Sequence, residues 1–343
     1  MRPASEIAES LSATSLQHYS RPLRDLLGDP NVTELCLQRP GEVFVERTGG
    51  WIRIDAPWAT DGWSRHFARL VATATSQRVN AEAPLLAASL PTGERVQIVL
   101  PPAAGPDGVV LSIRRPAAAA WSLHDLSRQG TFDATASAAV ACDGELLQTY
   151  LAADQQGFLA AAVRARCNIL VAGATGSGKT TLTKALILEI PRDERLISIE
   201  DAAELVFPLH RNSVRLFYSK EDQGRARVTP KQLLEASLRL RPDRILLAEL
   251  RGEEAYYFLR NVSSGHPGSI TSIHAGSTSL AFEQLGLLVK ESQAGRDMSM
   301  ADILRLSRAV IDIVICCDRR DGRRGVREIW WRDAPATQAS ARS

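Results

Sequence analysis

Residues 168–180 read NILVAGATGSGKT, and this stretch decides the fold. The apolar run at 168–172 predicts a buried strand, and residues 182–189 follow with a helical pattern. Between them, GATGSGKT at 173–180 matches the G-x-x-x-x-G-K-[ST] pattern of a phosphate-binding loop. A glycine-rich turn without a ligand is the alternative. The flanking strand and helix favour the phosphate-binding loop, because that loop connects these two elements.

The residue types in this loop indicate how it would hold a nucleotide. Glycines let backbone N–H groups turn toward phosphate oxygens, and the N-terminus of the next helix adds partial positive charge. Lys179 would reach the β- and γ-phosphate oxygens, and Thr180 is placed to ligate Mg²⁺. We therefore predict ATP and Mg²⁺ as cofactors. The predicted nucleotide-binding residues are Gly173, Ala174, Thr175, Gly176, Ser177, Gly178, Lys179, Thr180 and Thr181.

Composition limits the class of protein. With 343 residues and 45% hydrophobic content, the chain is long enough for two packed cores and too apolar to be disordered. The 41 basic and 39 acidic residues nearly cancel, so strong sequence-specific nucleic-acid binding is not expected. The beginning of the chain has no apolar signal segment, and Asp312 interrupts the apolar run at 309–317. We expect a soluble, cytoplasmic protein whose five cysteines are buried free thiols, with a metal-binding or redox role as the alternative.

The pattern changes along the chain and predicts two domains. Residues 1–115 predict an α+β domain with an antiparallel sheet, with a strand meander at 32–54 and a helix at 63–79. Residues 116–148, rich in alanine and serine, are typical of a linker. Residues 149–333 predict a RecA-like α/β domain with a mainly parallel sheet, and residues 334–343 a disordered tail.

The boundaries expected for single elements follow from the same patterns. Further strands of the first domain are expected at 95–100 and 109–114. Strands of the second domain are expected at 169–172, 196–199, 245–248, 269–273 and 311–316, and helices at 179–189, 230–240, 253–262 and 278–292. Trp330 and Trp331 are interpreted as packing residues.

Two other apolar strands of the second domain end in carboxylates. Residues 244–249 (RILLAE) end at Glu249, and residues 196–201 (LISIED) end at Glu200 and Asp201. Ligands of open α/β sheets bind at the carboxyl ends of the strands, where these acids would lie. Glu249 is the candidate base that orients or deprotonates water, and the other two acids are candidates for a catalytic or Mg²⁺-linked role. A helix cap or a surface charge is the alternative for any single acid.

Four blocks occur in order: GATGSGKTT at 173–181, RLISIEDAAEL at 195–205, RPDRILLAELRGEEA at 241–255 and GHPGSITSIHA at 265–275. With them the chain resembles the secretion ATPases, and among these the traffic ATPases of type IV secretion and conjugation systems. The resemblance extends from about residue 29 to residue 317. It departs from the family pattern at Gln38-Arg39, where an asparagine is expected.

The resemblance implies roles for residues of the second domain. Glu249 would be the hydrolytic carboxylate, and Glu200 and Asp201 would support Mg²⁺ and the attacking water. His274, together with His266, would couple the phosphate state to domain movement. A hydrogen-bonded structural histidine is the alternative for each.

The resemblance also implies that arginines of the first domain reach the terminal phosphate. PTGERVQ at 91–97 and SIRRP at 112–116 match the family pattern and indicate Arg95 and Arg114, with Arg115 as the alternative to Arg114. Guanidinium groups stabilise the charge that spreads over the phosphate oxygens in the transition state. Whether they act on their own subunit's nucleotide or on a neighbour's is open.

By this resemblance the chain is expected to form a hexameric Mg-ATPase ring at the cytoplasmic face of the inner membrane of a bacterium. It would power type IV secretion, conjugative transfer of DNA or protein, and pilus assembly. Its partners would be inner-membrane secretion-channel and coupling proteins, with peripheral contact to the membrane. A pilus-type or type II secretion ATPase, a RecA-like nucleic-acid motor and a non-hydrolysing scaffold are the alternatives.

Overall fold

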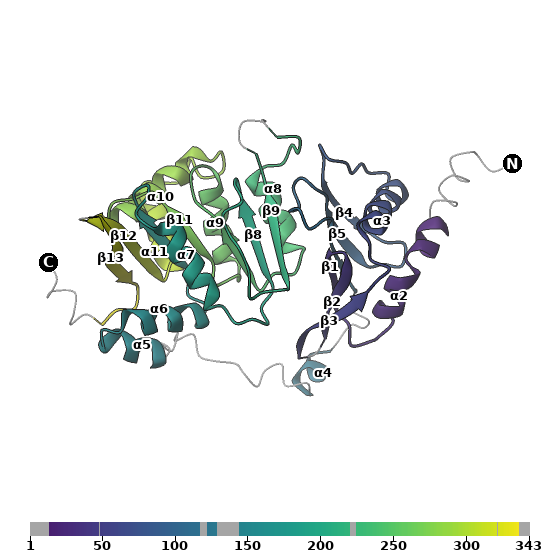
Figure 1. Ribbon diagram of the computed structural model, residues 1–343, viewed down its shortest axis with the longest axis horizontal. Helices are drawn as coiled ribbons and strands as arrows, with labels where there is room; N and C mark the ends of the chain where they lie inside the picture. The colour runs from purple at the N-terminus through teal and green to yellow at the C-terminus, as the bar shows by residue number, and fades with distance from the viewer. Residues whose placement is uncertain are drawn as a thin grey trace.

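The computed structural model describes residues 14–47, 49–116, 122–128, 144–219, 224–320 and 322–335. These residues form two lobes, here called the N-terminal lobe (described residues up to 116) and the C-terminal lobe (residues from 144 onward), which lie side by side in Figure 1. Most of the predicted linker, nearly all of the predicted tail and Cys142 lie outside the described residues. The predicted domain boundaries therefore remain predictions.

The N-terminal lobe is an antiparallel sheet covered on one face by helices. Its six strands lie in the order β3-β2-β1-β6-β5-β4. The strands are β1 (Glu34–Arg39), β2 (Gly41–Arg47), β3 (Gly50–Ala56), β4 (Leu85–Ser89), β5 (Arg95–Val99) and β6 (Val110–Arg114), and the helices are α2 (Arg21–Leu27) and α3 (Asp61–Ala74). The predicted α+β class is confirmed. Strand β4 was not predicted, because its sequence LLAAS carries no alternation of apolar and polar residues.

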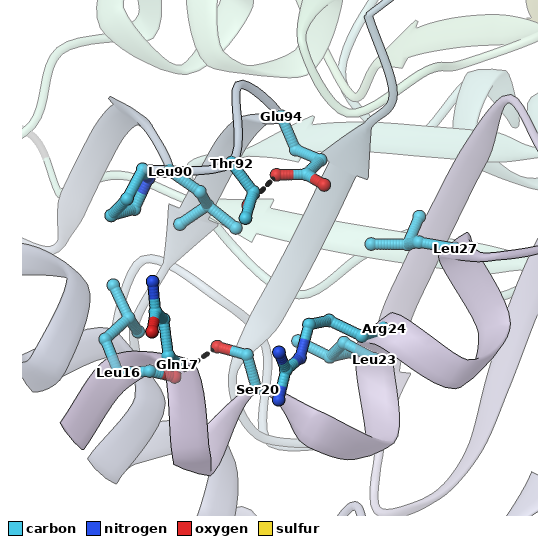
Figure 2. A pocket seen from close by; sticks show the side chains of 10 residues that line it. Leu16, Gln17, Ser20, Leu23, Arg24, Leu27, Leu90, Thr92 and Glu94 are labelled. Carbon is cyan, nitrogen blue, oxygen red and sulfur yellow. Dashed lines mark hydrogen bonds between the residues drawn. The ribbon is translucent and has the colours of Figure 1, made fainter. Parts of the chain in front are cut away.

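The segment before β1 packs against the turn between β4 and β5 (Figure 2). Leu16, Leu23 and Leu27 line a small cavity together with Leu90. Ser20 Oγ donates to the carbonyl oxygen of Leu16 at 2.5 Å, which satisfies the hydroxyl group inside this packing. The lining is mainly apolar, so this cavity belongs to the core of the lobe.

The two faces of the N-terminal sheet differ in polarity. Leu35 and Leu37 of β1 point toward α2 and α3, whereas the alternate residues Glu34 and Gln38 point to the opposite face. That second face carries a set of buried polar side chains: Glu34, Gln38, Gln97 and Ser112. The face is covered because the C-terminal lobe packs on it.

The C-terminal lobe contains two groups of strands joined edge to edge. Their orders are β9-β8-β10 and β11-β7-β12-β13. A parallel bridge between Leu250 and Ile273 and a hydrogen bond from Ser269 Oγ to the Ile245 carbonyl (2.7 Å) connect β10 with β11. The strands are β7 (Ile169–Gly173), β8 (Leu196–Glu200), β9 (Ser213–Phe217), β10 (Arg244–Leu247), β11 (Ile270–Ile273), β12 (Ile313–Arg320) and β13 (Arg323–Trp331). All pair in parallel except β13, which runs antiparallel to β12.

Helices cover both faces of this sheet. The apolar strands are buried on both sides, so Ile169 and Val171 contact one helical layer and Leu170 and Ala172 contact the other. One layer is α5 (Gly144–Leu151), α6 (Gln155–Arg164) and α7 (Lys179–Leu188). The other is α8 (Pro230–Leu238), α9 (Glu254–Ser263), α10 (Thr278–Glu291) and α11 (Met300–Val310). Helix α4 (Leu123–Arg128) lies between the lobes in the sequence. The predicted RecA-like α/β class is confirmed.

The N-terminal lobe covers the free edge of β9. Phe217 N donates to the Ala103 carbonyl at 2.7 Å, and Gly105 N donates to the Arg215 carbonyl at 2.9 Å. At the other end of the interface, Gln38 Nε2 donates to Asn212 Oδ1 at 3.0 Å. The chain thus uses Gln38, one of the two residues that depart from the family pattern, in the contact between its lobes.

Buried Arg195 is central to that contact. Its side chain is 0% exposed, and its Nε donates to the Leu240 carbonyl at 2.9 Å. Its Nη1 donates to both Gln38 and Asn212, so one guanidinium group joins β1 to the amino end of β8. Arg241 adds an ion pair with Glu46 of β2 at the same end of the sheet.

Candidate nucleotide site

The predicted phosphate-binding loop connects β7 to α7 with the backbone conformation that its glycines allow. Gly178 precedes α7 with φ +102°, a left-handed conformation that favours glycine. A Cβ atom on Gly173 would lie 2.3 Å from Ser177 Oγ and 2.7 Å from the carbonyl oxygen of Cys317 on β12. These two positions therefore require glycine, and the N-terminus of α7 follows the loop directly, where its N–H groups can bind an anion.

The side chain of Lys179 reaches back to the first residues of this loop. Its Nζ donates to the carbonyl oxygens of Gly173 (2.9 Å) and Ala174 (3.2 Å) and lies 3.8 Å from Glu249 Oε1. Burial lowers the pKa of Lys179, and the neighbouring carboxylate of Glu249 opposes this shift. The ammonium group is thus held between the loop and the carboxyl end of β10.

Glu249 joins the predicted residues into one cluster. His274, which follows β11, places Nε2 2.9 Å from Glu249 Oε1 and Nδ1 3.4 Å from Lys179 Nζ. Arg251 donates to Glu249 Oε2 and, at 3.2 Å, to Asp201 Oδ2 beyond the end of β8. The carboxyl ends of β7, β8, β10 and β11 therefore bring Lys179, Asp201, Glu249 and His274 together.

A carboxylate that sequence reasoning missed lies beside Thr180. Thr180 Oγ1 is 3.5 Å from Glu204 Oε2. Hydroxyl and carboxylate oxygens are the protein ligands that Mg²⁺ takes, so these two residues fit a magnesium ion beside the loop. No group of three or more His, Cys, Asp or Glu residues in the described part of the chain is arranged to hold a metal ion. Phosphate oxygens and water would complete the coordination.

Glu200 has different partners from those expected for a magnesium ligand. Its side chain is 0% exposed and accepts hydrogen bonds from Ser198 Oγ (2.6 Å) and from the backbone N–H groups of Glu204 and Leu205 (both 2.8 Å). Arg215 Nε donates to it at 3.1 Å. The carboxylate therefore fixes the loop that carries Asp201 and Glu204.

Arg95 and Arg114 lie away from this cluster. They are cross-strand neighbours on β5 and β6, and Arg114 also lies opposite Glu34 on β1. Within the described residues no contact joins either arginine to the phosphate-binding loop. The N-terminal lobe packs on β9, and β8, β10 and β11 separate β9 from β7, a distance of about 19 Å at ~4.8 Å per strand. Arg115 instead donates to the Asp29 carbonyl at 2.9 Å.

His266 and His274 lie at opposite ends of β11. His266 precedes the strand, and burial together with neighbouring Arg241 lowers its pKa. Arg241 forms the ion pair with Glu46 that contributes to the lobe contact. Of the two histidines, only His274 contacts the cluster at the loop.

Two of the contacting residues had a weak signal in the sequence. Arg251 stands two residues after Glu249, and Glu204 lies inside the block at 195–205. Acidic and basic residues are common near strand ends, so their positions in the sequence alone do not single them out. Their contacts with the predicted residues form only in the folded chain, where the ends of the strands lie next to each other.

Comparison with known proteins gives the family. A family model described as "Type II/IV secretion system protein" matches residues 17–320. The chain is 44% identical over 324 residues to the type IV secretion system protein VirB11 of Bartonella henselae, covering 90% of this chain and 91% of that protein. It is 43% identical over 327 residues to the type IV secretion system protein VirB11 of Brucella suis, and the match covers 93% of this chain and 91% of that protein.

A solved structure agrees with these relatives. The crystal structure of the VirB11 ATPase from the Brucella suis type IV secretion system, in complex with sulphate, superposes with a TM-score of 0.89 at 42% identity. The match covers 94% of this chain and 96% of that chain.

The fold, the loop and these matches define a P-loop ATPase, and the chain belongs to the type II/IV secretion system protein family. Within that family it is a type IV secretion ATPase of the VirB11 type, and its reaction is the hydrolysis of ATP. This identification selects the type IV branch over the alternatives considered from the sequence. Among the described residues no helix is long and apolar enough to cross a membrane.

Proposed function

We propose that this ATPase works as a hexameric, Mg²⁺-dependent ring at the cytoplasmic face of the inner membrane of a bacterium. The ring would drive type IV secretion, conjugative transfer and pilus assembly by acting on inner-membrane channel and coupling proteins. The observation that carries the catalytic part is the cluster of Lys179, Glu249, His274 and Arg251 at the carboxyl ends of the parallel strands.

In this proposal each residue of the cluster has a role in the hydrolytic step. Lys179 binds the terminal phosphates, and Glu249 orients the attacking water and accepts its proton. The water oxygen forms a bond to the γ-phosphorus while the bond to the β-phosphate oxygen breaks, which releases ADP and phosphate. His274 and Arg251 hold the Glu249 carboxylate in position from two sides.

Thr180, Glu204 and Asp201 are the residues that would hold Mg²⁺. A bound magnesium ion would neutralise charge on the phosphate oxygens. Glu200 contributes by fixing the loop between Asp201 and Leu205, so in this proposal it acts as a positioning residue. Because Arg251 bridges Asp201 and Glu249, the acidic residues of β8 and β10 respond together to the nucleotide.

Arg95 and Arg114 act in this proposal on the nucleotide of a neighbouring subunit. The support is their separation from the phosphate-binding loop of their own chain by the width of the sheet. A ring supplies the missing contact, because a head-to-tail interface places one surface of each subunit against a different surface of the next. His274 would sense the γ-phosphate, and His266 would take part in the lobe movement through Arg241.

Two variants and a matched control test the catalytic assignment. Lys179→Ala should lose nucleotide binding and turnover. Glu249→Gln should bind ATP within a few-fold of the wild type and release phosphate at least ~100-fold more slowly, because the proton acceptor is gone. Glu253→Gln removes an exposed carboxylate from the same loop and should leave both quantities unchanged. Near wild-type phosphate release by Glu249→Gln would refute the assignment, and light scattering with and without Mg-ATP tests the ring.

A further inference from the structure

The hairpin of β12 and β13 extends past the phosphate-binding loop. Cys317 on β12 pairs with Gly173, the last residue of β7, and β12 continues to Arg320. A bulge between Cys316 and Cys317 changes the register with β13 at this point, and bulges add twist that redirects a hairpin. Residues 318–327 (DRRDGRRGVR) contain five arginines and two aspartates. A cationic segment thus lies next to the loop, and the catalytic proposal does not use it.

One arginine of this hairpin contacts the loop directly. Measured from the place where a Cβ on Gly178 would sit, the Cδ, Cβ and Cγ atoms of Arg324 lie at 3.4, 3.6 and 3.9 Å. The aliphatic part of the Arg324 side chain therefore packs along the loop at the residue that precedes Lys179. It keeps the guanidinium group near the N-terminus of α7.

Among the residues that the structure describes, the Arg324 guanidinium has no partner, unlike those of Arg320 and Arg327. Arg320 pairs with Asp318 at 3.0 Å, and Arg327 donates to the Gly276 carbonyl at 3.3 Å. For the exposed Arg324 side chain, no ion pair or hydrogen bond joins the guanidinium to any residue in the described part of the chain. With respect to the described residues, the fold thus presents an unpaired guanidinium group, with five N–H donors, beside the phosphate-binding loop.

The position of the hairpin decides which part of a nucleotide it meets. Glu249 and His274 follow β10 and β11, on one side of β7, whereas β12 and β13 lie on the other side. The γ-phosphate must lie near Glu249 for hydrolysis, so the rest of the nucleotide extends across the loop away from that residue. We propose that Arg324 binds the α,β-diphosphate of the nucleotide, the part that ATP and ADP share. This inference rests on the proposed nucleotide site.

Three substitutions in the full chain test it, with titration of a fluorescent ADP analogue and displacement by ADP and by ATP. Arg324→Met keeps the aliphatic stem and removes the charge, so it should weaken ADP and ATP alike by about tenfold. Arg324→Lys should recover most of the affinity. Arg323→Met is the control, because adjacent residues of a strand face opposite sides and Arg323 precedes Arg324 on β13, so this variant should match the wild type.

The thermal unfolding midpoint of Arg324→Met should equal that of the wild type, since the side chain is exposed. Unchanged ADP affinity in Arg324→Met would overturn the inference. Loss of ATP affinity with ADP affinity retained would also overturn it, because the guanidinium would then bind the γ-phosphate. A wild-type chain that binds no ADP would instead refute the nucleotide site on which the inference rests.

Discussion

Two buried carboxylates of the N-terminal lobe, Glu34 and Glu42, show how the groups around a side chain determine the direction of its pKa shift. Glu34 and Glu42 are each 2% exposed. Burial raises the pKa of Glu34, and the hydrogen bond from Ser112 only partly offsets this. Burial acts on Glu42 too, but hydrogen bonds from Arg53 (2.6 Å) and Arg211 (2.7 Å) outweigh it, so the pKa of Glu42 is lowered.

These opposite shifts predict opposite effects of the same substitution on stability. For Glu34, ionisation costs stability as the pH rises above about 4.5, so Glu34→Gln should raise the thermal unfolding midpoint at pH 7. For Glu42, the ionised form stabilises above about pH 4.5 and this is lost as the pH falls through the lowered pKa, so Glu42→Gln should lower the midpoint at pH 7. Circular dichroism melts from pH 4 to pH 7 measure both. Shifts of the same sign at pH 7 would contradict the prediction.

For single residues, the sequence was sufficient where the pattern lies in neighbouring positions of the chain. The spacing of the loop identified Lys179 and Thr180, and strand ends identified Glu249 and Asp201. Glu204 was not identified and Arg251 was given no role, because their contacts with Thr180 and Asp201 join residues that are far apart in the sequence. Glu200 fits the expected position at a strand end, but neighbouring backbone N–H groups occupy its carboxylate, which no sequence pattern indicates.

The elements around β13 pack through an aromatic cluster. Trp331 is 3% exposed, and its ring centroid lies 4.8 Å from that of Tyr150 on α5 and 5.3 Å from that of Phe158 on α6. Trp330 contacts Phe282 of α10 at 4.8 Å. The predicted packing role of both tryptophans is confirmed. Because the two tryptophans are adjacent on β13, their side chains point to opposite faces of the sheet, and each packs against the helices on its own face.

Removal of the Trp331 side chain should therefore weaken the packing of α5 and α6 against β13. Trp331→Ala is expected to lower the free energy of unfolding by about 3–5 kcal/mol, since a large ring leaves a cavity between β13, α5 and α6. Guanidinium chloride unfolding followed by circular dichroism measures it. Leu287→Ala, at a side chain 54% exposed, is the control and should change stability by about 0.5 kcal/mol or less. Equal effects of the two would refute the packing role.

Element prediction succeeded where one pattern dominated. The apolar strands at 169–172, 196–199 and 245–248 and the helices that follow them were placed within a few residues. Strands β9 and β13 were not predicted, because Arg215 interrupts the apolar residues of β9 (SVRLF) and β13 begins with charged residues at the sheet edge. Helix α5 begins at Gly144, inside the segment interpreted as a linker, and it is held there by tertiary packing rather than by its own sequence.

At the scale of the whole molecule, the proposal requires that arginines cross between subunits. Mixing two inactive variants tests this: Lys179→Ala, which keeps the arginines, and the double variant Arg95→Ala with Arg114→Ala, which keeps the loop. If the arginines act on the neighbour, equal mixing should restore roughly a quarter of the wild-type phosphate release, because one interface in four then has both intact halves.

Each variant measured alone should remain inactive, and this is the control for the mixture. Subunits must be mixed before assembly, and light scattering shows that mixed and unmixed samples reach the same size. A mixture as inactive as its components would refute action between subunits and place the arginines on their own chain's nucleotide.

Strand β13 leaves one border of the C-terminal sheet without a partner strand among the described residues, whereas the N-terminal lobe covers the other border at β9. Arg323, Arg324 and Arg327 lie on this uncovered strand. Two molecules that approached along it would bring like charges together, and the repulsion disfavours strand-to-strand polymerisation. Growth into open-ended fibres is thereby discouraged, and self-association is left to surfaces that can close on themselves.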